Sequence, residues 1–135
     1  MARDNGFKDF ANRMAKVPDS IRRQTNKAIE TNAAEWVKVS RATAPKDPED
    51  GTPLHDSIRH YATDTGGQVV RAGGETTTKD SPAGPSDYAI HQEFGTTDMP
   101  ASPFFWPVYR SFKKRWASRR SRALNKAFKE FQNGQ

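Results

Sequence analysis

Two stretches with apolar residues at helical spacing, one towards each end of the 135-residue chain, constrain the fold most. The first stripe consists of Ile21, Thr25, Ala28, Ile29, Ala33, Trp36, Val37 and Ser40. The second consists of Phe105, Val108, Tyr109, Phe112 and Trp116, continued less regularly by Ala123, Leu124, Ala127, Phe128 and Phe131. Spacings of three and four residues predict a helix that ends near Ala44-Pro45 and a long amphipathic C-terminal helix, with Pro107 in its first turn.

A third helical pattern precedes the first stripe. Phe7, Phe10, Met14 and Val17 recur three and four residues apart, and Pro18 then interrupts the pattern. The chain therefore opens with two helices or with one long kinked helix.

The middle of the chain changes period. Residues 57–63 alternate in polarity, 64–67 have the composition of a turn, and 68–72 form a second short run, which together predict a hairpin. Residues 73–87 carry no large apolar side chain, which predicts a mobile loop or an arm that orders only against a partner. Residues 87–94 read as a third strand. The prediction is one α+β domain over 1–135, with helices around a small antiparallel sheet.

The composition limits what the chain does alone. Only 33% of the residues are hydrophobic and the mean hydropathy is −0.95, so we expect a small core. Chains this polar often gain buried surface from partners, although small soluble domains can have the same composition. The absence of cysteine excludes disulfides and thiolate metal sites. No apolar run approaches the roughly 20 residues of a membrane span, which favours a cytoplasmic protein that does not cross a membrane.

The net charge of +6 comes from one segment, 110–130. Its basic residues are Arg110, Lys113, Lys114, Arg115, Arg119, Arg120, Arg122, Lys126 and Lys129, and its one acid is Glu130. This asymmetry predicts a polyanionic neighbour, either nucleic acid or an acidic protein face, although a solvated helix face would have the same composition. The candidate contacts are Lys113, Lys114, Arg115, Arg119, Arg120 and Arg122.

No pattern for catalysis stands out. His91 and Glu93, two apart on the predicted strand, could form a pair of metal ligands, but no third ligand follows at a usual spacing. No serine lies in a nucleophile elbow, and the glycine pairs lack the residues of a phosphate loop. The sequence therefore predicts a protein that is not an enzyme and has no cofactor; a small metal-dependent hydrolase is the minor alternative.

The segment YAIHQEFGTTDMPASPFFWP, residues 88–107, predicts a corner between a strand and the last helix. Gly95 would allow a positive φ, and the prolines would stiffen the descent into the helix. We expect Phe94 to reach the core and Glu93 to point outward or towards a basic partner. Of Phe104 and Phe105, one would enter the core and the other stay free for a neighbour, unless both are core residues.

This segment also carries a family resemblance. Its shared positions are Tyr88, Ala89, Glu93, Phe94, Gly95, Thr96, Pro100, Ala101, Pro103, Phe104, Phe105 and Pro107, preceded by Ala44, Pro45, Gly51, Leu54, Ser57 and Ile58. With these residues the chain resembles the tail-component family of long-tailed bacteriophages, the neck or tail-completion proteins, which is similar to the minor tail protein Z of lambda-like phages. Asp50-Gly51 stands where the family has Thr-Gly.

The resemblance implies a structural protein of the virion, located at the head–tail junction. It implies a homo-oligomeric ring, hexameric in this expectation, that joins the tail to the head connector while genome DNA passes through its lumen. Its partners would be neck, connector and tail-tube or tail-terminator proteins. The interface candidates are Tyr88, Glu93, Phe94, Gly95, Phe104, Phe105 and Trp106. The alternative is a free nucleic-acid-binding protein that uses the basic C-terminal segment.

Overall fold

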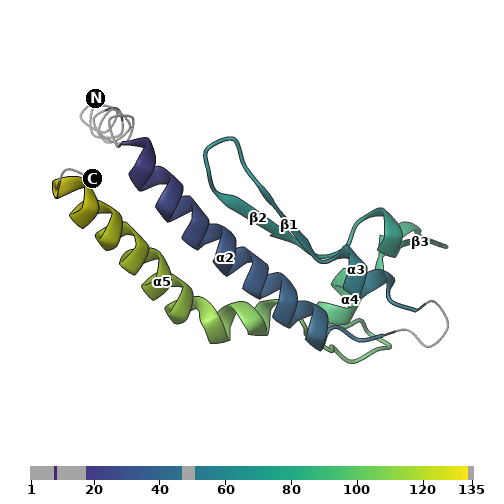
Figure 1. Ribbon diagram of the computed structural model, residues 1–135. Coiled ribbons are helices and arrows are strands. Elements are labelled where there is room, and N and C mark those ends of the chain that lie inside the picture. The colour runs from purple at the N-terminus through teal and green to yellow at the C-terminus, as the bar shows by residue number, and fades with distance from the viewer. Residues whose placement is uncertain (1–7, 9–17, 47–50, 134–135) are drawn as a thin grey trace.

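The computed structural model describes Lys8 and residues 18–46 and 51–133. Two long helices, α2 (Asp19–Thr43) and α5 (Trp106–Gln132), lie side by side and run in opposite directions (Figure 1). A hairpin of β1 (Arg59–Ala62) and β2 (Gln68–Arg71) lies along α2. The short helices α3 (Pro53–Ser57) and α4 (Tyr88–Phe94) and the hairpin of β3 (Thr78–Ser81) and β4 (Gly84–Asp87) gather at one end of this pair. The predicted α+β class is confirmed.

Helix α2 follows its predicted apolar stripe, whereas α5 buries Val108, Trp116 and Ala127 and leaves Tyr109, Leu124, Phe128 and Phe131 of its stripe exposed. Helix α2 buries Ile21, Ala28, Ala33, Val37 and Ser40, all members of the predicted stripe, and it ends where Pro45 would prevent continuation. Helix α5 begins next to Pro107, which tolerates a first-turn position because its missing N–H has no intrahelical partner there. The helix predicted around Phe7 to Val17 lies outside the described residues.

The first hairpin is also confirmed. Arg59 pairs with Arg71 and Ala62 with Gln68 in antiparallel register. The turn closes through a hydrogen bond from the Thr63 N–H to the Gly67 carbonyl at 2.9 Å. Gly66 supplies the positive φ of +88° that the turn requires. Helix α3 was not predicted; it ends at Ser57, the first residue of the alternating segment 57–63.

Residues 73–87, predicted as a mobile loop or an arm that orders only against a partner, contain regular structure; their mobility stays a prediction. A 3₁₀ turn (Glu75–Thr77) leads into the β3–β4 hairpin. The segment is fixed by polar contacts: the Asp87 carboxylate accepts hydrogen bonds from the Gly74 N–H (3.0 Å), the Thr77 hydroxyl (2.6 Å) and the Ala89 N–H (2.9 Å). Polar side chains hold this arrangement together, so the lack of large apolar residues in the sequence does not predict its absence.

The third predicted strand is a helix, α4. Asp87 caps its first turn by accepting from the Ala89 N–H, and Gly95 follows its last residue with φ +76°. The segment 87–94 that suggested a strand is too short, at eight residues, to distinguish the two periods. The sheet is consequently two separate hairpins instead of one three-stranded sheet.

The core lies where α2, α3, α4 and the start of α5 meet. Its buried members are Val37, Ala44, Leu54, Ile58, Ala89, Phe104 and Phe105. Among the described residues, no helix combines the length and the apolar character that crossing a bilayer requires.

Candidate functional site

The corner between α4 and α5 is built on the Glu93 carboxylate. One oxygen, Oε2, accepts hydrogen bonds from the N–H groups of Phe104 (2.8 Å) and Phe105 (3.0 Å). The other, Oε1, accepts from the N–H of Trp106 at 2.9 Å. These donors precede and begin α5, where backbone N–H groups have no intrahelical partner and the helix dipole favours a negative charge. Glu93 is 7% exposed, so the expectation that it points outward is wrong.

The turn after α4 depends on Gly95. Its φ of +76° and ψ of 173° lie in a region that is essentially restricted to glycine. A β-carbon there would lie 2.7 Å from the Ala101 N and 3.0 Å from the Met99 carbonyl oxygen. The expected positive φ is therefore present. Further along, the Ser102 N–H donates to the Gln92 carbonyl at 2.7 Å and ties the descending chain to α4.

An aromatic cluster joins this corner to α2. The Trp36 ring stacks on Phe105 with centroids 4.6 Å apart and contacts Trp106, Tyr109 and Trp116 at 5.2–5.8 Å. The Trp36 Nε1–H also donates to the Phe105 carbonyl at 3.1 Å. The start of α5 is thus held from one side by a carboxylate and from the other by stacked rings.

The structure divides the predicted interface residues into two groups. Phe104 and Phe105 are both buried, so the expectation that one stays free is wrong, and the alternative that both belong to the core is correct. Phe94 is 67% exposed and does not reach the core, because Ala89 and Glu93 occupy the inner face of α4. Trp106 remains 41% exposed, and Tyr88 is half-buried.

Sequence analysis missed Ile90. It precedes Phe94 by one helical turn and is 58% exposed, so the two side chains adjoin on the outer face of α4. With Trp106 they border a shallow hollow of about 250 Å³. The i, i+4 spacing was present in the sequence, but it carries meaning only once the segment is known to be a helix.

The predicted basic contacts differ in their surroundings. Arg119 donates to Asn32 Oδ1 at 2.8 Å and pairs with Glu35 of α2 at 3.1 Å, and Arg115 pairs with Glu35 at 3.4 Å. The remaining predicted contacts, Lys113, Lys114, Arg120 and Arg122, are exposed. The charge of α5 is therefore partly used inside the molecule, a role that its composition alone did not reveal.

Histidines do not form a metal centre in the described part of the chain, where no three His, Asp, Glu or Cys side chains are suitably grouped. His91 lies 2.6 Å from the Ser86 hydroxyl, and both Glu93 oxygens are occupied. His55 contacts Asp56 at 2.9 Å; this hydrogen bond, with one from Thr52, holds the pKa of the exposed Asp56 carboxyl below its ordinary value.

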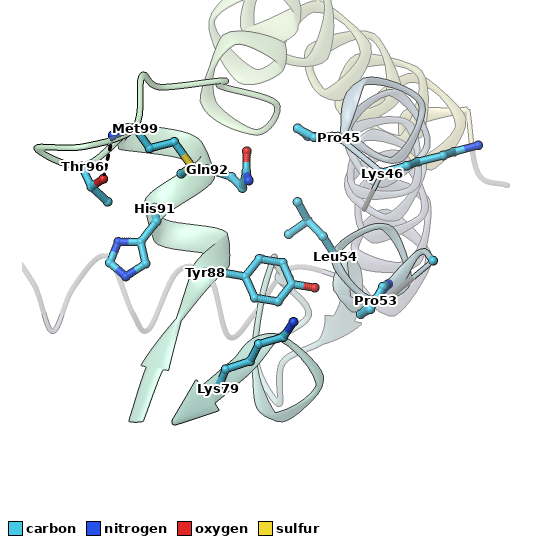
Figure 2. A pocket seen from close by; sticks show the side chains of 11 residues that line it. Pro45, Lys46, Pro53, Leu54, Lys79, Tyr88, His91, Gln92, Thr96 and Met99 are labelled. Atoms are coloured by element: carbon cyan, nitrogen blue, oxygen red, sulfur yellow. Dashed lines mark hydrogen bonds between the residues drawn. The ribbon is translucent and has the colours of Figure 1, made fainter. Parts of the chain in front are cut away.

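A hollow of about 560 Å³ opens between α3 and α4. Figure 2 shows Tyr88 beside Lys79 and facing Leu54, with Met99 and His91 on the side opposite Leu54. The Lys79 ammonium lies 5.4 Å from the centre of the Tyr88 ring, within range of a cation–π contact. The hollow is also bordered by Lys46 and Gly51, which flank residues outside the described part of the chain, and we assign no ligand to it.

These features define a class of protein: a small helical and β-hairpin domain whose most elaborate site fixes one helix against another and leaves apolar side chains on its surface. Residues 8–95 match the family described as "Bacteriophage HK97-gp10, putative tail-component". Because the match covers more than half of the 135 residues, the chain belongs to this phage tail-component family. No curated protein and no solved structure matches the chain.

The family indicates a structural protein of the virion. The matched range ends at Gly95, so it includes α4 with Glu93 and Phe94 but neither the descent to Trp106 nor α5. The predicted resemblance to phage tail components is confirmed.

Proposed function

We propose that the chain is a component of the phage head–tail junction, where copies of it close a hexameric ring between the head connector and the tail. Genome DNA would pass through the lumen of this ring. Membership of the tail-component family supports the structural role and a place in the virion. The ring, its six copies and its position at the junction are the parts that need a test.

The exposed outer face of α4 is the observation that carries the proposal. Ile90 and Phe94 present two large apolar side chains to solvent beside the partly exposed Trp106. Apolar patches of this kind commonly mark contacts between proteins. In a ring, one surface of each subunit meets a different surface of the next, so a neighbouring copy would cover this face.

The proposed role of α5 is to contact a neighbouring protein, and retention of DNA is the lesser role. Arg115 and Arg119 are paired with Glu35, which lowers the positive charge available to phosphates. A strongly basic lumen would also slow the passage of the genome, because each phosphate contact adds salt-dependent affinity. The runner-up, a free nucleic-acid-binding protein, predicts tight and salt-sensitive binding of duplex DNA by the isolated chain.

Two measurements test the proposal. Gold-labelled antibody against the chain should mark the head–tail junction of particles of the phage that encodes it; labelling along the tail or at its tip would refute the position. Light scattering coupled to gel filtration should then give the mass of the purified chain and of an Ile90→Ser/Phe94→Ser variant. We expect ring-sized species, or copies incorporated into particles, for the wild type and not for the Ile90→Ser/Phe94→Ser variant.

Leu124→Ser is the matched control, since Leu124 is an exposed apolar residue on α5 away from α4. It should assemble as the wild type does. Equal assembly of the double variant and the wild type would refute the α4 interface. A monomer that binds duplex DNA tightly and releases it as salt rises would favour the nucleic-acid-binding alternative.

A further inference from the structure

A groove of about 490 Å³ lies over α2, between β2 and α5. The strand and the helix flank α2 in Figure 1. Ile29, Ala33 and Trp36 of α2 contribute to its lining, together with Val70 of β2 and Trp116 of α5. Lys113, Lys114 and Arg120, all on α5, also border it. The groove therefore combines an apolar floor with a basic rim. Its lining includes none of Ile90, Phe94 and Trp106, although Val70 also borders the shallow hollow beside those residues.

The spacing of the lining residues gives the groove its length. On α2 they run from Ile29 to Trp36 and on α5 from Tyr109 to Arg120, which corresponds to about 10 Å and about 16 Å at 1.5 Å per helical residue. A segment of two to three helical turns has this length. Helices that bind grooves insert apolar side chains spaced three and four residues apart.

The rim calls for negative charge. No carboxylate lines the groove, and within the described residues Lys113, Lys114 and Arg120 have no acidic partner. The nearby acid, Glu35, is already held by Arg119, Arg115 and the Trp116 Nε1–H. An occupant with acidic residues along its flank would complement the rim, because opposite charges across an interface favour association and fix its register.

The aromatic rings in the groove favour protein over nucleic acid. Single-stranded nucleic acids bind by stacking bases on exposed aromatic faces. Here Trp36 stacks on Phe105, and Trp116 stacks on Phe112 with centroids 5.7 Å apart. Tyr109 contacts Trp36 and Trp116 at 5.2 and 6.1 Å. Because these rings pack against one another, the groove is better suited to apolar side chains than to stacked bases.

We propose that this groove binds a short amphipathic helix of an adjoining virion protein. Its apolar side chains would pack on Ile29, Ala33 and Val70, and its acidic side chains would contact Lys113, Lys114 and Arg120. The identity of the partner as a virion protein rests on the proposed function; the chemistry of the groove does not.

The test uses a stapled helical peptide of about three turns, with leucines at i, i+3, i+4 and i+7 and glutamates beside them. Fluorescence anisotropy of the labelled peptide measures its binding to the full chain. One control peptide has lysine in place of each glutamate, and another has the same composition without the apolar stripe. We expect the acidic peptide to bind more tightly than both controls, and its affinity to fall as salt rises.

Variants of the chain locate the binding. Lys113→Glu/Lys114→Glu should weaken the acidic peptide about tenfold or more, since two favourable rim pairs become repulsive. Ala117→Trp should also weaken it, because Ala117 lines the groove and the added ring fills it. Arg122→Glu/Lys126→Glu, which reverses two charges on α5 outside the groove, should leave the affinity within about twofold. Circular dichroism checks that every variant folds.

Three results would overturn the proposal. The acidic and basic peptides could bind the chain equally tightly, or the acidic peptide could bind the two charge-reversed variants with equal affinity. Finally, duplex or single-stranded DNA could bind through Lys113 and Lys114 while the acidic peptide does not bind. The peptide assay uses the purified chain, so it fails or succeeds independently of labelling at the head–tail junction. If antibody labelling places the chain at the head–tail junction but the groove binds no peptide, the groove inference is refuted and the proposed function is not.

Discussion

Replacement of Glu93 by alanine is expected to lower the free energy of unfolding by about 3–5 kcal/mol. The carboxylate accepts hydrogen bonds from the N–H groups of Phe104, Phe105 and Trp106 at 2.8–3.0 Å. A buried donor left without a partner costs about 1–3 kcal/mol, and two of these three hydrogen bonds are buried. The Trp106 N–H is partly buried and can turn to water, so the three costs do not simply add.

Glu93→Gln separates the charge from the volume of the side chain. Its amide oxygen can still accept from Phe104 and Phe105, but its NH₂ group then faces the N–H of Trp106, and the interaction of a full charge with the start of α5 is lost. We expect a destabilisation of about 1–3 kcal/mol. A free energy of unfolding that falls in the order wild type, Glu93→Gln, Glu93→Ala would indicate a helix cap that needs a hydrogen-bond acceptor.

Urea denaturation followed by circular dichroism and by tryptophan fluorescence measures these differences, provided that the two signals coincide. Glu30→Ala is the control, because Glu30 is an exposed acid on α2, and we expect its unfolding free energy to stay within about 0.5 kcal/mol of the wild type. If Glu93→Ala were no more destabilising than Glu30→Ala, the carboxylate would not fix the start of α5, and the account of the corner would be wrong.

Three further predictions concern single residues. Gly95→Ala should cost about 1–3 kcal/mol or more in the same denaturation assay, because φ +76° with ψ 173° strains any β-carbon; an unchanged midpoint would contradict this. Asp87→Ala should speed hydrogen exchange of the Ala89 amide, which donates to Asp87 at 2.9 Å in the first turn of α4, and unchanged protection would refute the role of that carboxylate. His55→Ala should raise the pKa of Asp56 towards its ordinary value in a carboxyl NMR titration. Since the folded-state pKa is lowered, the stabilisation that Asp56 contributes is present above its unfolded-state pKa and is lost as pH falls through the folded value; a titration of Asp56 unchanged by the substitution would exclude His55 as the cause.

The long helices and the first hairpin could be predicted because each depends on local patterns. The stripe on α2 repeats over several turns, so a single misplaced residue changes little. The β1–β2 hairpin has a compact turn in which Gly66 takes a positive φ. In both cases the residues that determine the element are neighbours along the chain.

The second hairpin could not be predicted in this way. Its fixing contacts join residues separated along the sequence: Asp87 reaches back to Gly74 and Thr77, and the Gly73 N–H donates to the Ser57 hydroxyl at 2.9 Å. Polar side chains of common types carry these contacts, and their partners become apparent only in three dimensions. The same holds for Glu35, whose pairing with Arg119 crosses from α2 to α5.

The error at residues 88–94 explains most of the errors at the site. As a strand, the segment would place Ile90, Gln92 and Phe94 on one face, and Glu93 on the other. As helix α4, it places Ala89 and Glu93 together on the inner face, because they are four residues apart, and both are buried. Its boundaries follow from Asp87, which caps the helix, and Gly95, which ends it. Both residues indicate a helix, but the short alternation of apolar residues favoured a strand.

The helical register also links the corner to the surface proposed for assembly. Ile90 and Phe94 each follow an inner residue by one position, so the register that turns Ala89 and Glu93 inward turns these two side chains outward. Rotating α4 to bury Phe94 would withdraw Glu93 from the three N–H groups that precede and begin α5. The exposure of Phe94 is therefore a consequence of how α5 is capped. In the proposed ring, a neighbouring subunit would cover that apolar face without undoing the cap.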